Sequence, residues 1–279
     1  LFYSGVPLER LDQIKKGAAI KYSPIINYYD YSGDFGNIRH EGDVSFNSGK
    51  KPVKMLKNII NIANLEKTDI ILDFFSGSSS TAHACIQYNK ENNTNYNFIM
   101  VQLPENNGLS DYKNVCELAK QRLRNVGNKI QQNSNDKILD IGFKVFKLDS
   151  SNIKKWNPDT KDLEKSLFDQ VNNFVDGRTE EDVLYEIILK CGLDLTVPVE
   201  ELNIQGKKVY SVGMGALIVC LDNDITLEVA NEIAKLDTVF EDKQNVTVVF
   251  KDNGFKDDSV KTNIKETIRG YGIGKFVTV

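Results

Sequence analysis

The chain has 279 residues, enough for one large domain or two of ordinary size, and its 41% of hydrophobic residues excludes a disordered chain. No apolar run approaches the roughly 20 residues that a membrane-spanning helix requires, so we expect no membrane partner. The net charge of −4 lacks the basic excess of proteins held on nucleic acid by phosphate contacts. Any such affinity must therefore come from a local patch or from sequence beyond the chain.

Cysteines and histidines are few and scattered. No Cys-x-x-Cys pair occurs and the chain has only 2 histidines, so a zinc site is not expected. The 4 cysteines fall in apolar or helical surroundings, which predicts buried free thiols in a reducing, cytoplasmic compartment. No basic-then-apolar leader is visible. The sequence from Leu1 onward reads like the middle of a protein, which favours a fragment of a longer one.

The N-terminal stretch is rich in Tyr, Gly, Asp and Asn and has little periodicity. Residues 25–29 predict a short strand and residues 34–37 a turn. Pro52 suits the first turn of a helix, and apolar residues follow it at helical spacing as far as Ala63. A small basic cluster lies around this helix start, and it fits either a patch for nucleic acid or a solvated helix face. Its members are Lys50, Lys51, Lys54 and Lys57.

Residues 69–81 are the most informative stretch. Branched apolar residues predict a strand that ends in Asp73, a loop of glycine and small hydroxyl residues follows, and a helix begins behind it, with Ser78 or Ser79 as a suitable cap. This order builds ligand pockets in α/β proteins, because the loop backbone and the helix start present N–H groups. The same order occurs in most α/β domains. The repeated glycines of a dinucleotide site and the Lys of a P-loop are absent, so the pattern alone leaves both readings open.

A second strand completes a strand–helix–strand unit. The helix behind the loop is predicted to run to about residue 89, and residues 98–103 form a near-continuous apolar run, typical of a parallel strand buried on both faces. Ligands bind at the carboxyl ends of such strands, where Asp73 and Glu105 are expected to meet. An acid at the second strand end can accept both hydroxyls of a ribose. A surface Glu after Pro104 is the alternative reading.

A long amphipathic helix is predicted to begin near residue 109, with Lys120, Arg124 and Lys129 on its polar face. Residues 143–148 alternate and predict a half-buried strand, and the polar stretch after it suggests a domain boundary near residue 150. The other face of the helix is lined by Val115, Leu118, Ala119, Arg122, Leu123, Val126 and Ile130.

The last part of the chain alternates β and α patterns and contains no glycine-rich pocket, so we expect a small α/β module for assembly. Its predicted helices begin near residue 161, at the acidic turn 179–182 with Gly192 after the helix end, at the cap Thr226, and at Asp257. Its predicted strands form a hairpin over residues 207–221 and then cover residues 245–250 and 275–279.

Three motifs in order resemble one family. The loop Asp-Phe-Phe-Ser-Gly-Ser-Ser-Ser-Thr-Ala-His-Ala at residues 73–84 resembles the cofactor loop of amino-methylating DNA methyltransferases, above all the modification subunit of type III restriction–modification systems. Residues 46–56, with Phe46 and Lys51-Pro52, resemble the family's upstream element, and residues 98–105 resemble its second strand. The similarity extends over most of the chain. It implies S-adenosylmethionine as cofactor and a Rossmann-like α/β methyltransferase domain, here partial, followed by a small C-terminal α/β domain.

The resemblance also implies roles for matching residues. Asp73 would face the methionine amino group and Glu105 would bind the ribose, with Leu103 or Pro104 beside the adenine. The family often has Gly-Thr where Ser79 and Ser80 stand. If that backbone has positive φ, Ser79 adds about 1–2 kcal/mol of strain and weakens cofactor affinity. His83 is expected to pack as a helix residue under the loop. The remaining implied cofactor contacts are Phe46, Lys51, Pro52, Phe75, Gly77, Ser78 and Thr81.

No Asp-Pro-Pro or Asn-Pro-Pro string occurs, so no catalytic residue is assigned; in the family this amine-activating loop lies N-terminal to the target-recognition region. The resemblance thus divides the chain into the end of that region at 1–45, the cofactor half of the methyltransferase domain at 46–150, and an assembly domain at 151–279. We expect the cofactor-binding part of a site-specific DNA adenine methyltransferase, inactive alone. In the full subunit its partners would be duplex DNA, a second modification subunit and a restriction subunit.

Two alternatives stay open. The chain could be a non-catalytic assembly module that docks other subunits of a restriction–modification complex, with vestigial cofactor binding. It could also be an unrelated dinucleotide-binding enzyme, for which no nicotinamide or flavin site is apparent. Binding of S-adenosylmethionine separates the first alternative from the leading hypothesis.

Overall fold

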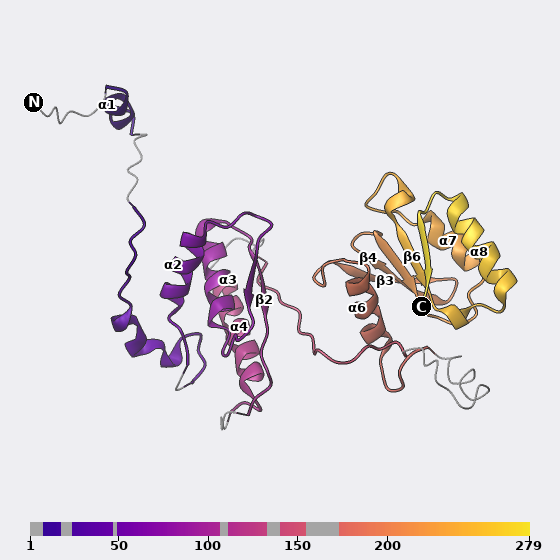
Figure 1. Cartoon of the computed structure of the whole chain (residues 1–279), viewed down its shortest axis with the longest axis horizontal. Helices are drawn as coiled ribbons and strands as arrows, with labels where there is room; N and C mark the ends of the chain where they lie inside the picture. Colours follow the sequence, from indigo (N-terminus) through magenta and orange to yellow (C-terminus); the bar gives the residue numbers. More distant parts are fainter. Residues whose placement is uncertain (1–7, 18–23, 47–48, 107–110, 133–139, 155–172) are drawn as a thin grey trace, which may run out of the picture. The chain divides into compact units, whose positions relative to one another are not determined.

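The computed structural model describes residues 8–17, 24–46, 49–106, 111–132, 140–154 and 173–279. The chain forms two compact units, Leu1–Phe143 and Lys144–Val279, and each has its own core (Figure 1). The predicted boundary at residue 150 lies after this division, and a separate segment over residues 1–45 stays a prediction.

The first unit is built from helices around a small parallel sheet. Its helices are α1 (Leu8–Lys15), the 3-10 helix η1 (Ser32–His40), α2 (Val53–Ala63), α3 (Ser80–Asn92) and α4 (Val115–Gln132), and its strands are β1 (Ile70–Asp73) and β2 (Asn97–Met100). The strands are parallel, with Ile70 opposite Asn97 and Asp73 opposite Met100. Strand, loop, helix and strand thus follow each other as predicted.

Helices α2, α3 and α4 lie side by side along the sheet (Figure 1). Buried Ala82 and Ile86 of α3 pack with the apolar face of α4 and with Phe98 and Met100 of β2. Ala84 and Cys85, also on α3, pack with α2 and with Ile71 of β1. The helices therefore bury one face of the sheet, and α3, which is covered from both sides, is the centre of this unit.

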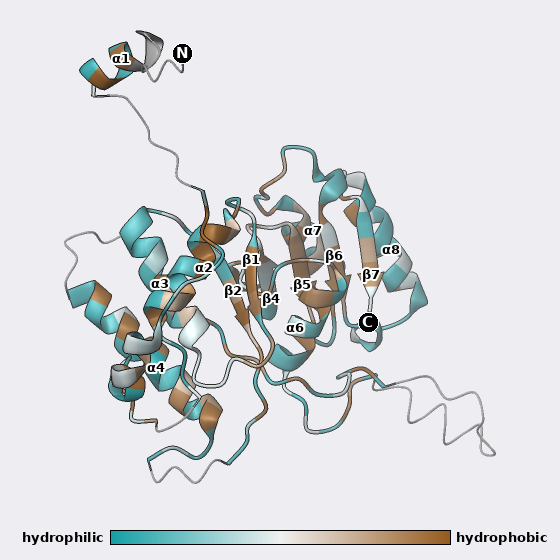
Figure 2. Cartoon of the chain, turned by 60° about the vertical axis from the view of Figure 1, so that its left-hand side comes forward, coloured by the Kyte–Doolittle hydropathy of each residue, from teal (hydrophilic) through white to brown (hydrophobic). Residues whose placement is uncertain are grey.

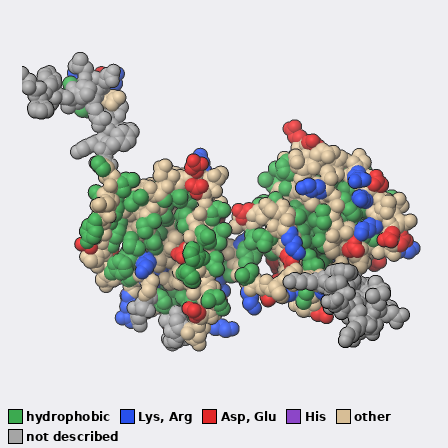
Figure 3. Space-filling model, in the orientation of Figure 1, with side chains coloured by type: hydrophobic (Ala, Val, Ile, Leu, Met, Phe, Trp, Pro, Cys, Tyr) green, Lys and Arg blue, Asp and Glu red, His purple; other side chains and the backbone are tan. Residues whose placement is uncertain are grey.

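The other face of the sheet is exposed, which corrects the prediction of a strand buried on both faces. Leu72 and Ile99 are paired across the two strands, yet they are 59% and 50% exposed. Ile70 and Val101 are about equally open. Alternate side chains of each strand pack against the helices, and the apolar side chains between them are exposed. Figure 2 shows the hydrophobic character of both strands, and Figure 3 shows hydrophobic side chains on the surface of the first unit.

Several predictions for irregular segments were wrong. Residues 25–29 form no strand, and Ile25 and Tyr28 are exposed. Residues 34–37 lie within η1 instead of a turn. The helix predicted from residue 109 begins at Val115, with residues 107–110 outside the described part. Residues 143–148 form no strand of the described sheets, and Leu148 is 98% exposed.

The second unit is a five-stranded mixed sheet in the order β3-β4-β5-β6-β7. The strands are β3 (Val199–Ile204), β4 (Lys207–Val212), β5 (Leu217–Cys220), β6 (Thr247–Phe250) and β7 (Lys275–Thr278). Helix α6 (Glu180–Lys190) packs on one face, and α7 (Leu227–Lys235) and α8 (Asp258–Gly270) pack on the other. The short 3-10 turns η2 (Lys243–Asn245) and η3 (Asp252–Gly254) flank β6.

Local sequence signals explain this unit well. Thr179, Thr226 and Asp257 each accept a hydrogen bond from a backbone N–H of the helix that they cap, and Thr179 forms a capping box with Asp182. The predicted hairpin is confirmed as β4–β5. The edge strand β3 was not predicted, because its exposed acidic residues obscure the alternation. Of the helix predicted near residue 161, residues 161–172 lie outside the described part.

None of the helices in the described residues combines the length and apolar character needed to span a membrane.

Candidate functional site

Asp73 stands at the carboxyl end of β1, where it organises the loop that follows. Its Oδ2 accepts a hydrogen bond from Thr81 Oγ1 at 2.6 Å, and its Oδ1 accepts one from the Phe75 backbone N–H at 3.2 Å. The carboxylate therefore joins the strand end to the first turn of α3. A carboxylate has about four lone-pair sites, so Asp73 retains acceptor capacity for a ligand.

The loop between β1 and α3 has a left-handed backbone at two positions. Gly77 has φ +52° and Ser79 has φ +55°. The Gly77 N–H donates to Gln102 Oε1 at 2.8 Å, and the Ser79 N–H donates to the Ser76 carbonyl at 2.8 Å. Ser79 occupies the N-cap position of α3, but its side chain makes no cap hydrogen bond, since its backbone is left-handed and not extended as capping requires. The predicted cap position is confirmed, while the predicted capping interaction is wrong.

Replacing Ser79 with glycine should stabilise the first unit. A left-handed non-glycine residue costs about 1–2 kcal/mol, and the extra chain entropy of glycine offsets part of the relief, so we expect a net gain of about 0.5–1 kcal/mol. Urea unfolding measures the gain. Ser79→Ala is the matched control, because it removes the hydroxyl but keeps the strained Cβ. A loss of stability with glycine would contradict the strain argument.

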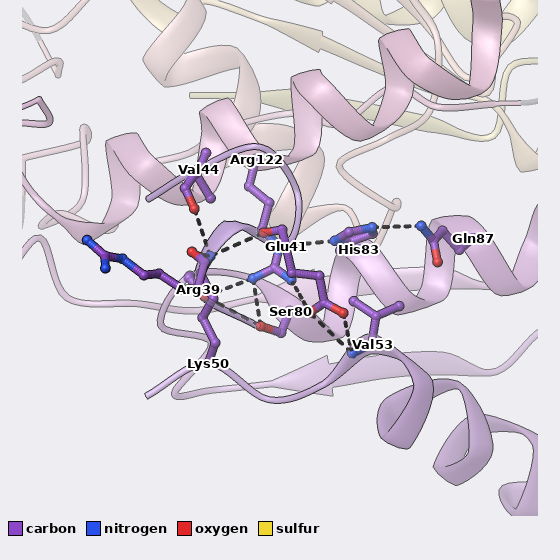
Figure 4. A network of polar contacts seen from close by, with 10 residues as sticks. Arg39, Glu41, Val44, Lys50, Val53, Ser80, His83, Gln87 and Arg122 are labelled. Carbon is purple, nitrogen blue, oxygen red and sulfur yellow. Dashed lines mark hydrogen bonds and ion pairs between the residues drawn. The ribbon is translucent and has the colours of Figure 1, made fainter. Parts of the chain in front are cut away.

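Arg122 of α4 is fully buried behind this loop and contacts three other segments (Figure 4). Its Nη1 donates to Ser78 Oγ at 3.0 Å and to Ser80 Oγ at 2.8 Å, on either side of Ser79. Its Nε donates to His83 Nδ1 at 3.1 Å. Its Nη2 forms an ion pair with Glu41 Oε2 at 3.2 Å.

Glu41 extends the network to the segment before α2. The Glu41 carboxylate also accepts the Val53 backbone N–H, at 3.2 Å and 3.3 Å to its two oxygens. Gly42 makes room for Arg122: a Cβ there would lie 2.6 Å from Arg122 Cγ, and its φ of +80° also favours glycine. Asn125 of α4 donates to the Gly42 carbonyl at 3.3 Å.

Lys50 is buried in the same region, with 2% exposure, and donates to three backbone carbonyls. The acceptors are Arg39 at 2.5 Å, Glu41 at 3.2 Å and Val44 at 2.7 Å. Burial lowers the pKa of Lys50 to about 8, assisted by the positive charge of Arg122 and opposed by Glu41. Burial also lowers the pKa of Arg122 to about 10, with Glu41 again opposing the shift. Both side chains stay charged at neutral pH.

The four lysines of the predicted basic cluster have different surroundings, and Lys51 is exposed. Lys50 is internal, Lys54 pairs with Asp34 at 3.1 Å, and Lys57 pairs with Glu91 at 2.7 Å. Sequence spacing could not show this, because the partners lie on other segments.

His83 is buried in α3 and contacts the network from beneath the loop, as predicted. Burial lowers its pKa to about 3, and the neighbouring positive charge of Arg122 adds to the shift. The ring is therefore neutral. Because Nδ1 accepts from Arg122, the ring proton sits on Nε2, which lies 2.9 Å from Gln87 Nε2; the ring N–H finds an acceptor there when the Gln87 amide is turned so that its oxygen faces the ring. A neutral imidazole can thus pack beside a guanidinium without repulsion.

The buried neutral state of His83 should make stability fall in mild acid. The unfolded imidazole binds a proton near pH 6.5 while the folded one stays neutral to about pH 3, so its contribution is complete above pH 6.5 and is lost between the two values. Between about pH 7.5 and about pH 5 the loss from this group is about 2 kcal/mol. We expect the free energy of unfolding in urea to fall less over this pH range in His83→Asn than in the unmodified chain, and the difference should equal this amount. The asparagine amide oxygen can still accept from Arg122. An equal loss in both proteins would contradict a neutral His83.

The other predicted cofactor contacts surround this loop. Phe46 is half-buried, and its N–H donates to the Arg39 carbonyl at 3.3 Å; Lys51 is exposed and Pro52 is buried at the start of α2. Phe75 is 81% exposed beside Phe74, which is 62% exposed, and their ring centroids are 5.0 Å apart. These two aromatic rings form an exposed apolar surface beyond the end of β1.

Glu105 lies beyond the end of β2 and is exposed. Its backbone connects it to the start of α4, since its carbonyl accepts the Val115 N–H at 3.2 Å. Direct contacts thus join Asp73, Phe75 and Thr81, whereas Ser78 belongs to the Arg122 network. The structure places Glu105 on the neighbouring strand end without a direct contact to Asp73 among the described interactions.

Arg122 and Glu41 were not predicted as site residues. The signal for Arg122 was its position on the apolar face of α4, where a charged residue requires a buried partner. Nothing in the sequence near Glu41 identifies it, because the partner lies on a distant helix.

Among the described residues, neither the cysteines nor a metal-binding cluster provides a second candidate functional site. Cys85 and Cys220 are buried, which raises their pKa values to about 12 and about 11. Cys116 is partly buried, whereas Cys191 is exposed, so the prediction of four buried thiols was wrong. Among the described residues, no group of His, Cys, Asp and Glu side chains is arranged to hold a metal ion.

Comparison with known proteins identifies relatives of this chain. Residues 21–121 match the DNA methylase family. The chain is 32% identical to the Mod subunit of the type III restriction-modification enzyme StyLTI from Salmonella typhimurium over 138 residues, which cover 46% of this chain and 21% of that subunit. It is 28% identical to the EcoP15I Mod subunit of Escherichia coli over 239 residues, 81% of this chain and 34% of that subunit.

A third relative covers nearly the whole chain. The Mod subunit of the type III enzyme EcoPI from Escherichia phage P1 is 26% identical over 275 residues, which cover 94% of this chain and 40% of that subunit. The chain thus spans between about a fifth and two fifths of the length of these relatives. The matched family region contains the loop, α2, α3 and the start of α4.

Proposed function

We propose that the first unit binds S-adenosylmethionine at the carboxyl ends of β1 and β2, because residues 21–121 match the DNA methylase family and the chain is similar to the Mod subunits of type III restriction-modification enzymes. The observation that carries the proposal is the Asp73 carboxylate at the end of β1, followed by a loop with a left-handed backbone at Gly77 and Ser79 and by the start of α3. At this edge of a parallel sheet the acid suits the cationic amino group of an amino-acid ligand, and the backbone N–H groups suit its carboxylate.

Each predicted residue has a task that its position supports. Asp73 accepts hydrogen bonds from the amino group of the cofactor with the lone pairs that Phe75 and Thr81 leave free. Glu105, exposed beyond β2, accepts the ribose hydroxyls, and Leu103 or Pro104 lies beside the adenine. The methionine side is lined by Phe46, Lys51 and Pro52, while Gly77 and Ser78 approach it from the loop and the exposed ring of Phe75 covers it.

The reaction proposed for the full subunit is transfer of the cofactor's methyl group to the exocyclic amine of adenine in duplex DNA. S-adenosylmethionine supplies an electrophilic methyl group when bound, and this chain's residues hold and orient it. The amine also has to be activated by hydrogen-bond acceptors, and the chain has no Asp-Pro-Pro or Asn-Pro-Pro string for that task. We therefore propose a Rossmann-like cofactor half that does not methylate DNA alone, with a second modification subunit and a restriction subunit as partners of the full protein.

A second candidate is an assembly module with vestigial cofactor binding. The second unit favours it, because residues 173–279 enclose two separate apolar cores around one sheet and could serve as an independent docking domain. The second unit joins subunits under both candidates. The candidates differ only in whether the first unit still binds S-adenosylmethionine.

Calorimetric titration of the 279-residue chain with S-adenosylmethionine separates the two candidates. The proposal predicts one binding site, competition by S-adenosylhomocysteine, and no heat with a nicotinamide dinucleotide. Absence of binding by a chain that is folded by circular dichroism would leave the assembly module as the function. Labelled methyl groups should not appear in duplex DNA incubated with the chain, and their appearance would refute the proposed inactivity.

A further inference from the structure

Burying the charged side chain of Arg122 costs free energy, and its contacts indicate which role the residue has. It lies on the face of α4 that otherwise packs apolar residues such as Leu118 and Val126. Replacing both members of a buried ion pair by well-packed hydrophobic side chains is often neutral or stabilising. A packing role therefore does not account for a guanidinium with 0% exposure.

The contacts of Arg122 converge on the loop of the proposed site. The two hydroxyls that accept from its Nη1, those of Ser78 and Ser80, are separated by Ser79 alone. Ser79 has the strained left-handed backbone, with φ +55°. A single planar group that holds both neighbours fixes this backbone, because its fork geometry allows few other arrangements.

The opposite end of the guanidinium reaches the other side of the proposed site. Its ion pair with Glu41 leads to the Val53 N–H at the start of α2, directly after Lys51 and Pro52. One buried side chain thus links the loop that contains Gly77 and Ser78 to the segment expected to line the methionine side (Figure 4).

We propose that Arg122 is a positioning residue for S-adenosylmethionine: it fixes the loop over residues 76–80 relative to Glu41 and to the start of α2 at Val53, so that both sides of the site are formed before the cofactor arrives. This inference rests on the proposed function. It predicts an effect on affinity beyond stability, because a preformed site avoids the cost of ordering the loop on binding.

The test compares three variants of the full chain, and a fourth that combines two of them, by calorimetry with S-adenosylmethionine and by urea unfolding. Arg122→Lys keeps the charge but cannot reach both hydroxyls and His83 together. Ser78→Ala with Ser80→Ala removes the acceptors and leaves Arg122 in place, and it serves if the lysine variant does not fold. Arg124→Lys is the matched control, since Arg124 is exposed on the same helix.

We expect Arg122→Lys and the double serine variant each to raise the Kd roughly tenfold, the equivalent of one or two hydrogen bonds, and Arg124→Lys to leave it unchanged. Combining Arg122→Lys with the serine changes should raise the Kd no further than either alone, because both remove the same hydrogen bonds between Arg122 and the loop.

Lower stability with a Kd within about twofold of the original in both variants would overturn the inference, because Arg122 would then be structural only. A combined variant whose Kd rises by the product of the two separate tenfold increases would overturn the inference as well. If the unmodified chain binds no S-adenosylmethionine, the proposed function fails and the inference fails with it. That result is distinct from normal binding by the unmodified chain with an unchanged Kd in the variants.

Discussion

Replacing Asp73 with alanine is expected to weaken binding of S-adenosylmethionine at least about 100-fold, because a charge-assisted hydrogen bond to a cationic amino group is lost and the amino group is left without its acceptor. Calorimetry under the conditions used for the unmodified chain measures the change. Asp73→Asn should be nearly as weak, since the amide is neutral and one of its two polar groups is a donor.

The loop contacts of Asp73 make a control necessary. Asp73 also accepts from Thr81 Oγ1, so part of the loss could come from a disturbed loop. Thr81→Val removes that contact, keeps the shape of the side chain and leaves the carboxylate in place. We expect it to weaken binding roughly tenfold or less. Equal losses in Asp73→Ala and Thr81→Val would contradict a direct role for the carboxylate.

Replacing Arg122 with methionine is expected to destabilise the first unit by about 3–5 kcal/mol. The change leaves Glu41 without its ion-pair partner, and it removes the donor from His83 and from the hydroxyls of Ser78 and Ser80. Urea unfolding that follows a signal from the first unit measures the loss, because the two units can unfold separately.

Leu123→Met is the matched control for this change. Leu123 is a buried neighbour on α4, and replacing it with methionine conserves volume, so it should cost less than about 1.5 kcal/mol. A loss in Arg122→Met as small as that of the control would show that the polar network contributes little. It would also remove the physical basis for Arg122 as a positioning residue.

The sequence predicted the elements that depend on nearby residues. Thr179 and Asp182 form the capping box at the acidic first turn of α6, and the apolar face of α4 is as expected from its periodicity. The positive φ of Ser79 meets the condition under which a serine at this position was expected to be strained. In each case the signal lies within a few residues of its effect.

Features that depend on distant partners were missed or wrong. Arg122 and Glu41 are 81 residues apart in the chain, so no local pattern could pair them. The alternating run at residues 143–148 lacks a partner strand in the described structure, and alternation alone cannot supply one. The exposure of Leu72 could not be inferred either, since an apolar strand reads the same whether one or both faces are covered.

The position of S-adenosylmethionine in a crystal of this chain tests the central claim most directly. The account predicts that the amino group of the ligand lies within hydrogen-bonding distance of the Asp73 carboxylate, that its ribose hydroxyls contact Glu105, and that the loop keeps its left-handed residues. Density for the ligand elsewhere, or these two carboxylates facing separate surfaces, would contradict it.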